Sequence, residues 1–436
     1  MNDLKKQTIS SEEAINLVSQ SLNLRHKKER NFKLIGKFAI AIAMFFLITL
    51  FTIILFNGIP GLFQHYVQLE VEIDRETIDP KGDLSPQSLF EGDARSLINK
   101  ALYNSLGNID DRNEKKSARA IISSASSERL NKIVMESPEV LGQTISIKFP
   151  VDDDIDSFLR GYIDKNVPET ERRVKNQTIQ FIDKLNEDGR ISYEFSDYLF
   201  FGSASRNAEI AGIKGAFIGS IYTLLICLLI SFPLGVSTAI YLEEIAPKNW
   251  ITEFIEININ NLAAVPSVVF GIMGLAVFII AFGLPRSIPL LGGIVLALMT
   301  LPTIIISSRA AIRAVPPSIR DAAYGIGASK MQMIFHHVLP LAMPGMLTGT
   351  IIGMAQALGE TAPLLMIGMV AFIVDIPEGF TDPGTVLPVQ IFMWADFAER
   401  MFVHKTSAAI IILLTFLISM NIGAILLRKK LENRWL

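Results

Sequence analysis

The chain alternates between long apolar stretches and polar segments, and this pattern predicts six crossings of a membrane. A helix needs about 20 predominantly apolar residues to cross the hydrocarbon core of a bilayer. The stretches that meet this condition are residues 38–56, 215–242, 262–284, 288–308, 341–374 and 406–427. The expected fold class is therefore an all-α polytopic membrane protein, and prolines inside several spans are expected to kink them.

A polar segment of about 150 residues, the size of one ordinary domain, separates the first span from the second. Residues 64–74 and 191–195 have the pattern of strands. Helical patterns cover residues 89–106, 115–135 and 169–185. The segment 57–209, called the insert below, is therefore predicted to be a small α+β domain on the extracytoplasmic side.

Four aspartates lie close together in the insert, at positions Asp152, Asp153, Asp154 and Asp156. A calcium loop of the EF-hand type also needs a glycine and a terminal glutamate, and both are missing here. Carboxylates are favourable in the first turn of a helix. We therefore expect this run to be the solvated start of a helix.

Charge divides the chain into segments with different surroundings. Half of the residues are hydrophobic and 19% are charged, which is fewer than the roughly one quarter of a soluble protein. Clusters of lysine and arginine precede the first span and follow the last, so the positive-inside rule places both termini in the cytoplasm. The expected division is a cytoplasmic tail 1–37, a span 38–56, the insert 57–209, a core 210–427 with five spans, and a cytoplasmic tail 428–436.

The sequence contains no pattern of catalytic or metal-binding residues that we recognise. It has no Gly-x-x-x-x-Gly-Lys-Ser/Thr loop for nucleotide phosphates, no Gly-x-Ser-x-Gly and no His-Glu-x-x-His. The single cysteine, Cys227, excludes an intrachain disulfide. The 43 acidic and 40 basic residues nearly balance, which argues against a nucleic-acid partner. We expect no catalytic residue, no metal and no cofactor on this chain.

A polar, amphipathic stretch at residues 320–340 lies between two apolar runs, on the side predicted to be cytoplasmic. Gly327 can end a helical turn because glycine accepts a left-handed backbone. After it, Met331, Ile334, Phe335 and Val338 recur at helical spacing. We expect two short helices joined by a glycine bend at the membrane surface.

This stretch resembles the coupling loop of ABC importer permeases. The family pattern is Glu-Ala-Ala, a glycine four residues after the second alanine, and then Ile-x-Leu-Pro. Here Asp321 replaces the glutamate, and His337 stands where isoleucine is usual. The resemblance implies docking into a groove on a separate ATPase subunit. The residues concerned are Arg320, Asp321, Ala322, Ala323, Gly327, Leu339 and Pro340.

One acidic residue, Glu360, falls inside the predicted span 341–374. An ionised carboxylate in a membrane is costly, so it should face the interior of the bundle and have a partner. Candidate partners are Arg309 and Arg313, or a group on another subunit. We expect Glu360 and Thr361, with the two arginines, to serve a substrate pathway or its gating. The alternatives are a buried structural ion pair or a neutral, protonated Glu360, with arginines that only follow the positive-inside rule or bind lipid headgroups.

Three further segments, 231–247, 261–275 and 359–365, resemble the phosphate-specific ABC permeases of the PstA type. The resemblance covers roughly residues 210–427, and residues 1–209 are similar to an N-terminal extension of some members. It implies a type I ABC importer permease fold with six transmembrane helices, a location in the bacterial inner membrane, and inorganic phosphate as the substrate.

The same resemblance implies partners. The chain would pair with a PstC-type permease subunit within membrane lipid. A PstB-type ATPase dimer would bind ATP and Mg, and a PstS-type periplasmic protein would deliver phosphate. ATP-driven alternating access would move the phosphate inward. The chain itself would then be a transport subunit without an ATPase site, not an enzyme.

Two other functions fit parts of the sequence. A permease for another oxyanion, such as molybdate or sulfate, would need the same spans and the same coupling stretch. A membrane-anchored sensor would use the insert as its ligand-binding domain, but the predicted cytoplasmic segments are too short for a signalling domain. A membrane enzyme would need a nucleophile or metal constellation, which the sequence does not offer.

Overall fold

The computed structural model describes residues 11–107 and 109–432, and it divides the chain into two compact units, 1–56 and 57–436. The helix α1 (Ser11–Gly61) forms the described part of the first unit. Its portion Arg25–Gly61 is long and apolar enough to cross a membrane, in agreement with the predicted span 38–56. Its last turn belongs to the second unit, where Gly58 and Gly61 lie against α19 (Arg400–Glu432).

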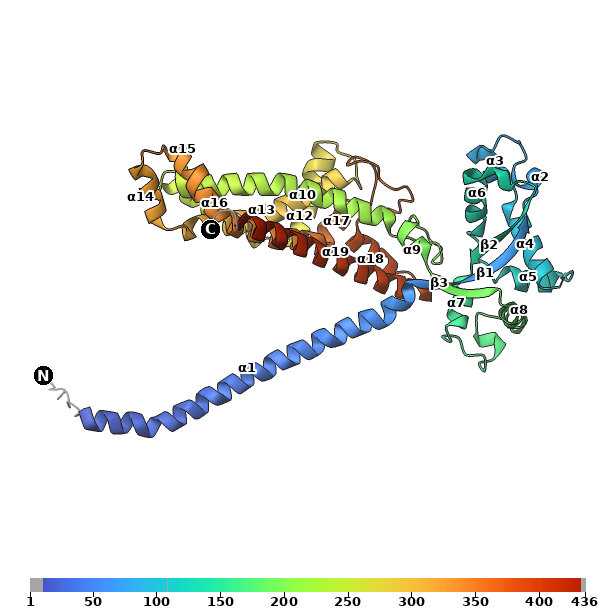
Figure 1. Ribbon diagram of the computed structural model, residues 1–436, viewed down its shortest axis with the longest axis horizontal. Helices are drawn as coiled ribbons and strands as arrows, with labels where there is room; N and C mark the ends of the chain where they lie inside the picture. Colours follow the sequence, from blue (N-terminus) through green and yellow to red (C-terminus); the bar gives the residue numbers. More distant parts are fainter. Residues whose placement is uncertain (1–10, 108, 433–436) are drawn as a thin grey trace. The chain divides into compact units, whose positions relative to one another are not determined.

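A three-stranded antiparallel sheet forms the centre of the insert (Figure 1). Its strands are β1 (Phe63–Glu72), β2 (Thr144–Pro150) and β3 (Ile191–Phe195), in the order β2-β1-β3. Leu69 and Val71, two residues apart on β1, are both fully buried, as expected when one face of a strand covers a core. The predicted strands are confirmed, whereas β2 was not predicted.

Short helices surround this sheet and complete the hydrophobic core of the insert. They are α2 (Arg75–Ile78), α3 (Pro86–Glu91), α4 (Ala94–Ser105), α5 (Arg112–Arg119), α6 (Ser126–Glu136), α7 (Asp153–Leu159) and α8 (Asn176–Glu187). The following helix, α9 (Asp197–Phe201), instead packs through Leu199 in a cluster with residues of the helical bundle. Leu102 on α4 and Leu130 on α6 are fully buried in one cluster with the sheet residues. The small α+β domain is therefore confirmed.

The predicted helix 115–135 is wrong in one respect, because the chain forms two helices there, α5 and α6. Arg95 donates hydrogen bonds to the carbonyl oxygens of Ile122 and Ser123, at 3.1 and 2.5 Å. These carbonyls are thus taken by a side chain. Ile122 also pairs with Val151 in an isolated β-bridge, which keeps this segment extended.

Four long helices form the membrane core: α10 (Lys214–Ile240), α13 (Pro289–Ala314), α16 (Leu339–Gly359) and α19. A π-helical turn, η3 (Tyr241–Ile245), extends α10. Gly235 of α10 lies against Ile304 of α13, and Gly349 of α16 lies against Ser307 of α13. Small residues at these crossings let the helix backbones approach, which is how helices associate within membranes.

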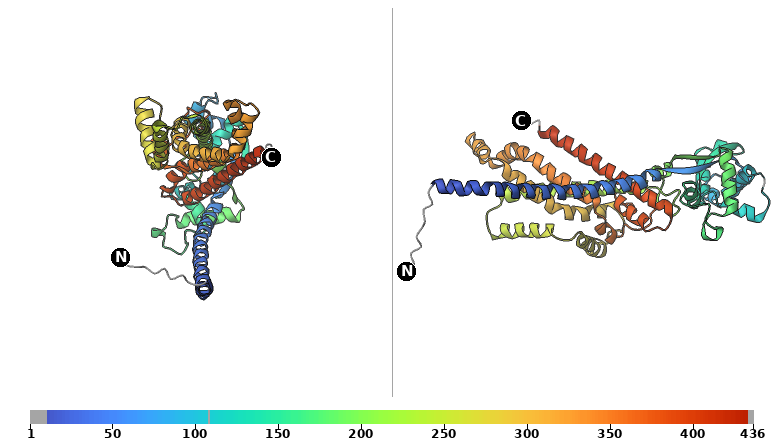
Figure 2. Two further views of the ribbon diagram at one scale, coloured as in Figure 1. Left: turned by 90° about the vertical axis from the view of Figure 1, so that its left-hand side faces the viewer. Right: turned by 90° about the horizontal axis from the view of Figure 1, so that it is seen from below.

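The predicted span 262–284 is not one straight helix. It comprises the end of α11 (Trp250–Ala263), then α12 (Ser267–Met273) and the π-helical segment η4 (Gly274–Ala281), with a bend of 104° between the two parts. Pro266 stands at the bend, where it cannot continue the preceding helix. Figure 2 shows this yellow pair at one side of the bundle. Among the described residues, five helices can cross a membrane, or six if the bent pair is one span.

The helix observed in the predicted span 341–374 is also shorter than that span. The helix α16 ends at Gly359, and a separate short helix, α17 (Ala362–Met366), follows. Pro363 lacks the N–H that would continue the hydrogen bonds of α16. Glu360 is therefore not midway along a span but caps the end of α16 in an extended conformation. The helix α18 (Leu387–Ala395) then leads to α19.

Candidate functional site

The stretch 320–340 forms two short helical segments with a glycine bend between them, as expected. The first is α14 (Pro317–Gly325), and the second begins with α15 (Lys330–Gln332) and continues through the π-helical turn η5 (Met333–Val338) into α16. Gly327 has φ +85°, the left-handed region that favours glycine. Ser329 and Gln332 exchange hydrogen bonds in a capping box that starts the second segment.

Apolar residues of this stretch face in two directions. Ala323, Met333, Ile334 and Val338 are buried in a cluster with residues of α10, α13 and α16. Tyr324, Ile326, Met331 and Phe335 are exposed, and Ile326 at the bend is 79% exposed. The expected single face of Met331, Ile334, Phe335 and Val338 is thus divided, because the π-helical turn changes the spacing. The exposed set forms an apolar patch around the bend.

The other residues expected to dock on a partner differ in accessibility. Asp321, Ala322 and Gly327 are exposed, whereas Ala323 is buried. Leu339 and Pro340 are half-buried at the start of α16. The part of the stretch that a partner could contact is therefore the bend together with the exposed residues of α14.

Arginines and glutamates form an ion-pair network beside this stretch, called the arginine–glutamate cluster below. Arg309 donates from Nε to Glu243 Oε1 at 2.6 Å, and its Nη2 lies 2.6 Å from Glu256 Oε1. Arg313 donates from Nε to Glu243 Oε2 at 2.7 Å. The side chains of Arg309 and Glu243 are about one tenth exposed. Arg309 on α13 is thereby bound to both η3 and α11.

A second part of the arginine–glutamate cluster holds α14. Arg320 donates from Nε and Nη2 to Glu244 Oε1, at 3.1 and 2.7 Å. The same guanidinium donates to the carbonyl oxygens of Val315 and Ile312, at 2.7 and 3.0 Å. The last carbonyls of a helix lack partners within the helix, so Arg320 satisfies two of them at the end of α13.

The structure does not bring Glu360 together with Arg309 or Arg313. Both arginines have carboxylate partners in the arginine–glutamate cluster. Glu360 and Thr361 are half-buried, and within 11–107 and 109–432 the Glu360 carboxylate has neither a hydrogen bond nor an ion pair. The alternative of a structural ion pair within this chain therefore has no partner among those residues.

Sequence reasoning missed Glu243, Glu244 and Glu256 as members of this site. Residues 243–250 look like a polar loop between two apolar runs. In the structure, α10 continues through η3, so the two consecutive glutamates lie on a helical turn. Two adjacent carboxylates at the end of a long apolar helix, with three arginines downstream, are the signal that could have pointed to them.

A second group of charged residues lies where the insert meets α19; we call it the junction cluster. It consists of Asp153, Asp156, Arg160 and Lys405. Asp153 Oδ1 accepts a hydrogen bond from the backbone nitrogen of Met401 at 3.0 Å. Lys405 is 1% exposed and donates to the carbonyl oxygens of Glu209 and Ala211, at 3.3 and 2.8 Å.

Within the junction cluster, Asp156 binds both Arg160 and His65. His65 Nδ1 lies 2.8 Å from Asp156 Oδ1, and the Arg160 Nε hydrogen bonds to Oδ2. Arg160 also donates to the carbonyl oxygens of Pro60 and Phe63, at 2.9 and 2.6 Å. The aspartates do begin a helix, since Asp152 caps α7. The expectation of a solvated start is wrong, because Asp153 and Asp156 are buried against these partners.

These surroundings shift the pKa values of the two buried aspartates, Asp153 and Asp156, in opposite directions. Burial raises the pKa of Asp153 to about 6, although its hydrogen bond from Met401 opposes the change. Burial also raises the pKa of Asp156, but the hydrogen bond with His65 and the charge of Arg160 outweigh it, so the net pKa is lowered. Asp156 is therefore a stable anion, whereas Asp153 can be protonated in mildly acidic solution.

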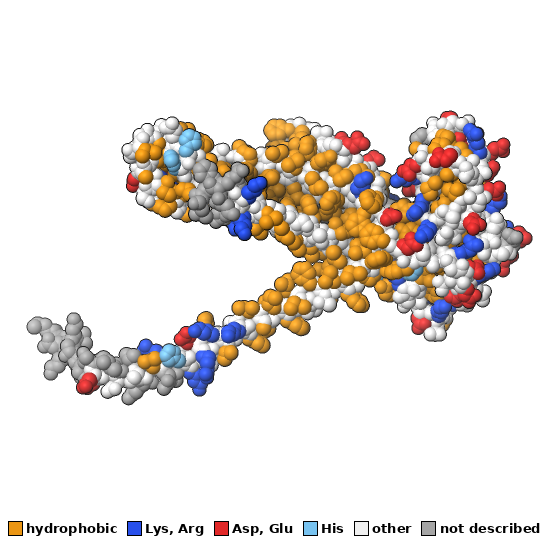
Figure 3. Space-filling view, in the orientation of Figure 1, with side chains coloured by type: hydrophobic (Ala, Val, Ile, Leu, Met, Phe, Trp, Pro, Cys, Tyr) orange, Lys and Arg blue, Asp and Glu red, His pale blue; other side chains and the backbone are white. Residues whose placement is uncertain are grey.

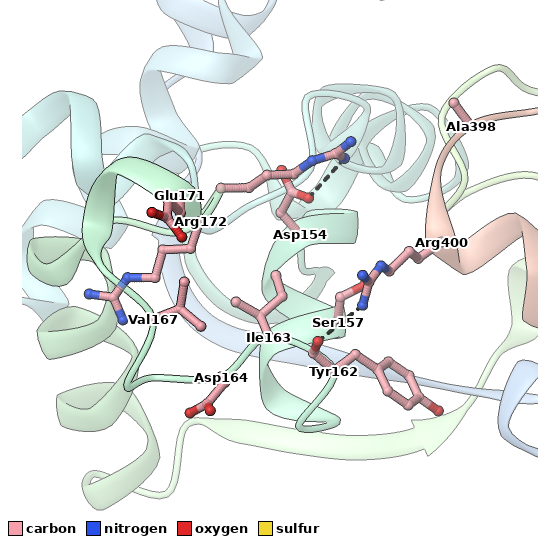
Figure 4. A pocket seen from close by; sticks show the side chains of 11 residues that line it. Asp154, Ser157, Tyr162, Ile163, Asp164, Val167, Glu171, Arg172, Ala398 and Arg400 are labelled. Carbon is pink, nitrogen blue, oxygen red and sulfur yellow. Dashed lines mark hydrogen bonds and ion pairs between the residues drawn. The ribbon is translucent and has the colours of Figure 1, made fainter.

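A cavity of about 330 Å³ adjoins the junction cluster (Figure 4). Asp154, Tyr162 and Arg400 are among its lining residues. Arg400 donates to the carbonyl oxygen of Tyr162 at 3.0 Å, and Arg173 lies 3.3 Å from Asp154. Asp154 and Arg173 therefore form an ion pair in the cavity wall, whereas Arg400 is held by a backbone carbonyl. Many charged side chains lie on the visible surface of the insert, whereas apolar side chains cover the visible flank of the helical bundle (Figure 3).

Two family models match the chain in turn. Residues 19–169 match a domain of unknown function, DUF3333, and residues 231–435 match the binding-protein-dependent transport system inner membrane component. The second match includes the stretch 320–340 and all three arginines of the arginine–glutamate cluster.

Two relatives of the chain agree with the second family model. The chain is 32% identical over 226 residues to the phosphate transport system permease protein PstA of Yersinia pestis, which covers 51% of this chain and 75% of that protein. It is also 32% identical to the probable ABC transporter permease protein YqgI of Bacillus subtilis, over 42% of this chain and 60% of that protein. It therefore spans less than two thirds of the Bacillus relative.

One solved structure that resembles the chain is the inward-facing MetNI methionine ABC transporter. The likeness covers 50% of this chain and 95% of that chain, with 15% sequence identity and a TM-score of 0.40.

Proposed function

Since the chain belongs to the family of binding-protein-dependent transport system inner membrane components, we propose that it is the permease subunit of an ATP-driven importer of inorganic phosphate. The observation that carries this proposal is the 32% identity to a phosphate permease over 75% of that protein's length. The segments 231–247, 261–275 and 359–365 support a PstA-type subunit. The partners would be a PstC-type permease, a PstB-type ATPase dimer and a PstS-type periplasmic protein.

The apolar patch around Gly327 is the surface that would meet the ATPase subunit. Tyr324, Ile326, Met331 and Phe335 are exposed there, and exposed apolar patches commonly mark interaction sites. ATP and Mg would bind to the partner, and this chain would need no cofactor of its own. Movement of the docked stretch would then alternate the access of phosphate from one side to the other.

Glu360 and Thr361 are our candidates for the phosphate pathway or its gate. They lie at the break between α16 and α17, where backbone groups are free of regular helix. Arg309 is better suited to gating than to direct phosphate binding, because Glu243 and Glu256 bind its guanidinium, whereas Arg313 pairs with Glu243 through Nε and its side chain is 62% exposed. An anion that used Arg309 would have to displace a carboxylate.

The proposed orientation places both termini and the stretch 320–340 in the cytoplasm, with the insert outside. The insert and α14 lie at opposite ends of the helical bundle (Figure 1), which supports this arrangement. Reporter domains fused after Lys81 or Lys175 should report the outside, and a fusion after Lys330 the inside. The proposed orientation is wrong if these fusions report the same side.

The decisive experiment is transport by the purified complex. The chain is co-expressed with its candidate partner subunits and reconstituted into vesicles, and ATP-dependent uptake of labelled phosphate is measured. Excess unlabelled phosphate should abolish the signal, whereas sulfate and molybdate should leave it unchanged. Competition by sulfate or molybdate at equal concentration would instead favour a permease for that oxyanion.

A further inference from the structure

The end of α10 contacts two different neighbours through two adjacent glutamates. Successive residues on a helix point in different directions, and only residues three or four apart share a face. Glu243 accordingly binds α13 through Arg309 and Arg313, while Glu244 binds α14 through Arg320. One helical turn, η3, is therefore connected to both elements at once.

Arg320 is the point at which three helix ends meet. Its guanidinium binds Glu244 of η3 and also the carbonyl oxygens of Ile312 and Val315 at the end of α13. The side chain of Glu244 is 8% exposed and that of Arg320 is 21% exposed. Removing one partner from a buried pair leaves the other charge without compensation, so this contact holds its geometry firmly.

The packing beneath this pair involves the same elements. Ala323 of α14 is buried in a cluster with Ala239 of α10 and Ile312 of α13. The exposed patch around Gly327 lies on the other side of the stretch. A displacement of that patch therefore reaches α10 and α13 through a small apolar contact and through the hydrogen bonds of Arg320, which join α14 to Glu244 of η3 and to the carbonyl oxygens at the end of α13.

We propose that Glu244 is a positioning residue that transmits movement of the stretch 320–340 to α10, and that Arg320 acts with it as one unit. This inference rests on the proposed function. It assigns Arg320 to mechanical coupling and not to the exit of an anion, because its donors are already bound. The expected consequence of breaking the pair is ATP hydrolysis that no longer drives transport efficiently.

The test uses the reconstituted complex with the Glu244→Gln variant, which keeps the shape of the side chain and removes its charge. Three quantities are measured: retention of the ATPase subunit, the rate of ATP hydrolysis, and phosphate transported per ATP hydrolysed. We expect retention and hydrolysis to persist, and transport per ATP to fall about tenfold, within the range of coupling changes seen for residues between sites. Loss of assembly would make Glu244 merely structural and would overturn the proposal.

The matched control is Glu253→Gln on α11. Glu253 is exposed, and it has no ion pair within 11–107 and 109–432. The same chemical change there should leave transport per ATP at the native value. An equal loss in both variants would contradict a specific role of Glu244.

A double-substitution cycle distinguishes loss of the Glu244–Arg320 interaction from general damage to the protein. Residues that act only through each other show non-additive effects. Adding Glu244→Gln to an Arg320→Gln variant should cause no further loss of transport per ATP, whereas additive losses would overturn the proposal. If the native complex itself fails to transport phosphate, the proposed function fails; if it transports and Glu244→Gln matches it, only this inference fails.

Discussion

The junction cluster and the arginine–glutamate cluster are both rich in buried charge, but they use it differently. In the junction cluster, Lys405 and Arg160 donate to backbone carbonyls, and Asp153 accepts from a backbone nitrogen. In the arginine–glutamate cluster, ion pairs join side chains from different helices, and Arg320 adds hydrogen bonds to the carbonyl oxygens of Ile312 and Val315.

This difference bears on what each region can do. A backbone acceptor is fixed by the fold around it, so a charge bound to it has one position. A buried pair between two side chains joins two helices directly, and breaking it is costly, so a movement of one helix is passed to the other. The junction cluster is thus suited to holding the insert in place. The arginine–glutamate cluster is suited to linking the movements of neighbouring helices.

The largest effect is expected from Asp156→Ala in the junction cluster. Arg160 and His65 would lose their common partner in a buried site, and breaking such a pair costs about 3–5 kcal/mol. The insert should become sensitive to protease at much lower temperature, which gel analysis of treated membranes would detect. The control is Glu194→Ala, which removes an exposed pair with Lys148 and should change little. Equal sensitivity of the two variants would contradict a fixed junction.

A smaller effect is expected from pH, through Asp153. Its pKa in the folded protein is about 6, above the value near 3.9 of an unfolded chain, so its contribution to stability is lost as pH rises through about 6. Resistance of the insert to heat should therefore fall between pH 4.5 and 6.5, by about 2 kcal/mol for this group. Asp156, whose pKa is lowered, stays ionised over that interval.

Asp153→Asn is the matching variant for the pH prediction, because its amide oxygen can still accept from Met401. The fall in heat resistance should be smaller in this variant, and the remainder should come from Asp152, whose pKa burial also raises to about 6. A profile that rises with pH in the native protein would contradict the assignment.

In the region of the arginine–glutamate cluster, Gly327→Val should weaken binding of the ATPase subunit. A residue with a β-carbon in a left-handed conformation costs about 1–2 kcal/mol, which is roughly tenfold in affinity. The measurement is the amount of ATPase subunit that co-purifies. Gly325→Val is a strict control, because a side chain there also meets open space but the backbone is helical. Equal loss of the ATPase subunit from both variants would mean that the size of the added side chain, and not the conformation of the bend, weakens binding.

The smallest effect is expected from Arg313→Ala. This arginine is 62% exposed, and Glu243 keeps its buried partner Arg309. Exposed ion pairs contribute at most about 1 kcal/mol. Heat resistance of the assembled complex should stay within that margin, and a large loss would show that the two regions are equally rigid.

Local patterns allowed much of the fold to be predicted. Alternation identified β1, the apolar runs identified the spans, and Gly327 marked the bend. The bend of 104° near Pro266 could not be predicted, because proline fixes where a helix stops but its neighbours decide the angle. The burial of Asp153 depends on Met401, which is 248 residues away in the sequence.

The candidate site was predicted in part. The stretch 320–340, which begins with Arg320, and the two arginines before it were recognisable, since spacing and composition are local. Their partners were not, because Glu243 and Glu244 meet Arg313 and Arg320 only after the long helices have folded against one another. A positive charge at a helix end looks the same in sequence whether it faces lipid, an anion or a carboxylate.

Only Leu62 separates the end of α1 from the start of β1. A domain joined through one residue cannot sample the volume that a flexible linker of many residues would give it. The insert therefore does not behave as a tethered receptor that searches for its ligand. Because Asp153 of the insert also binds the backbone of Met401 at the start of α19, any molecule that approaches this end of α19 meets the insert in one fixed position.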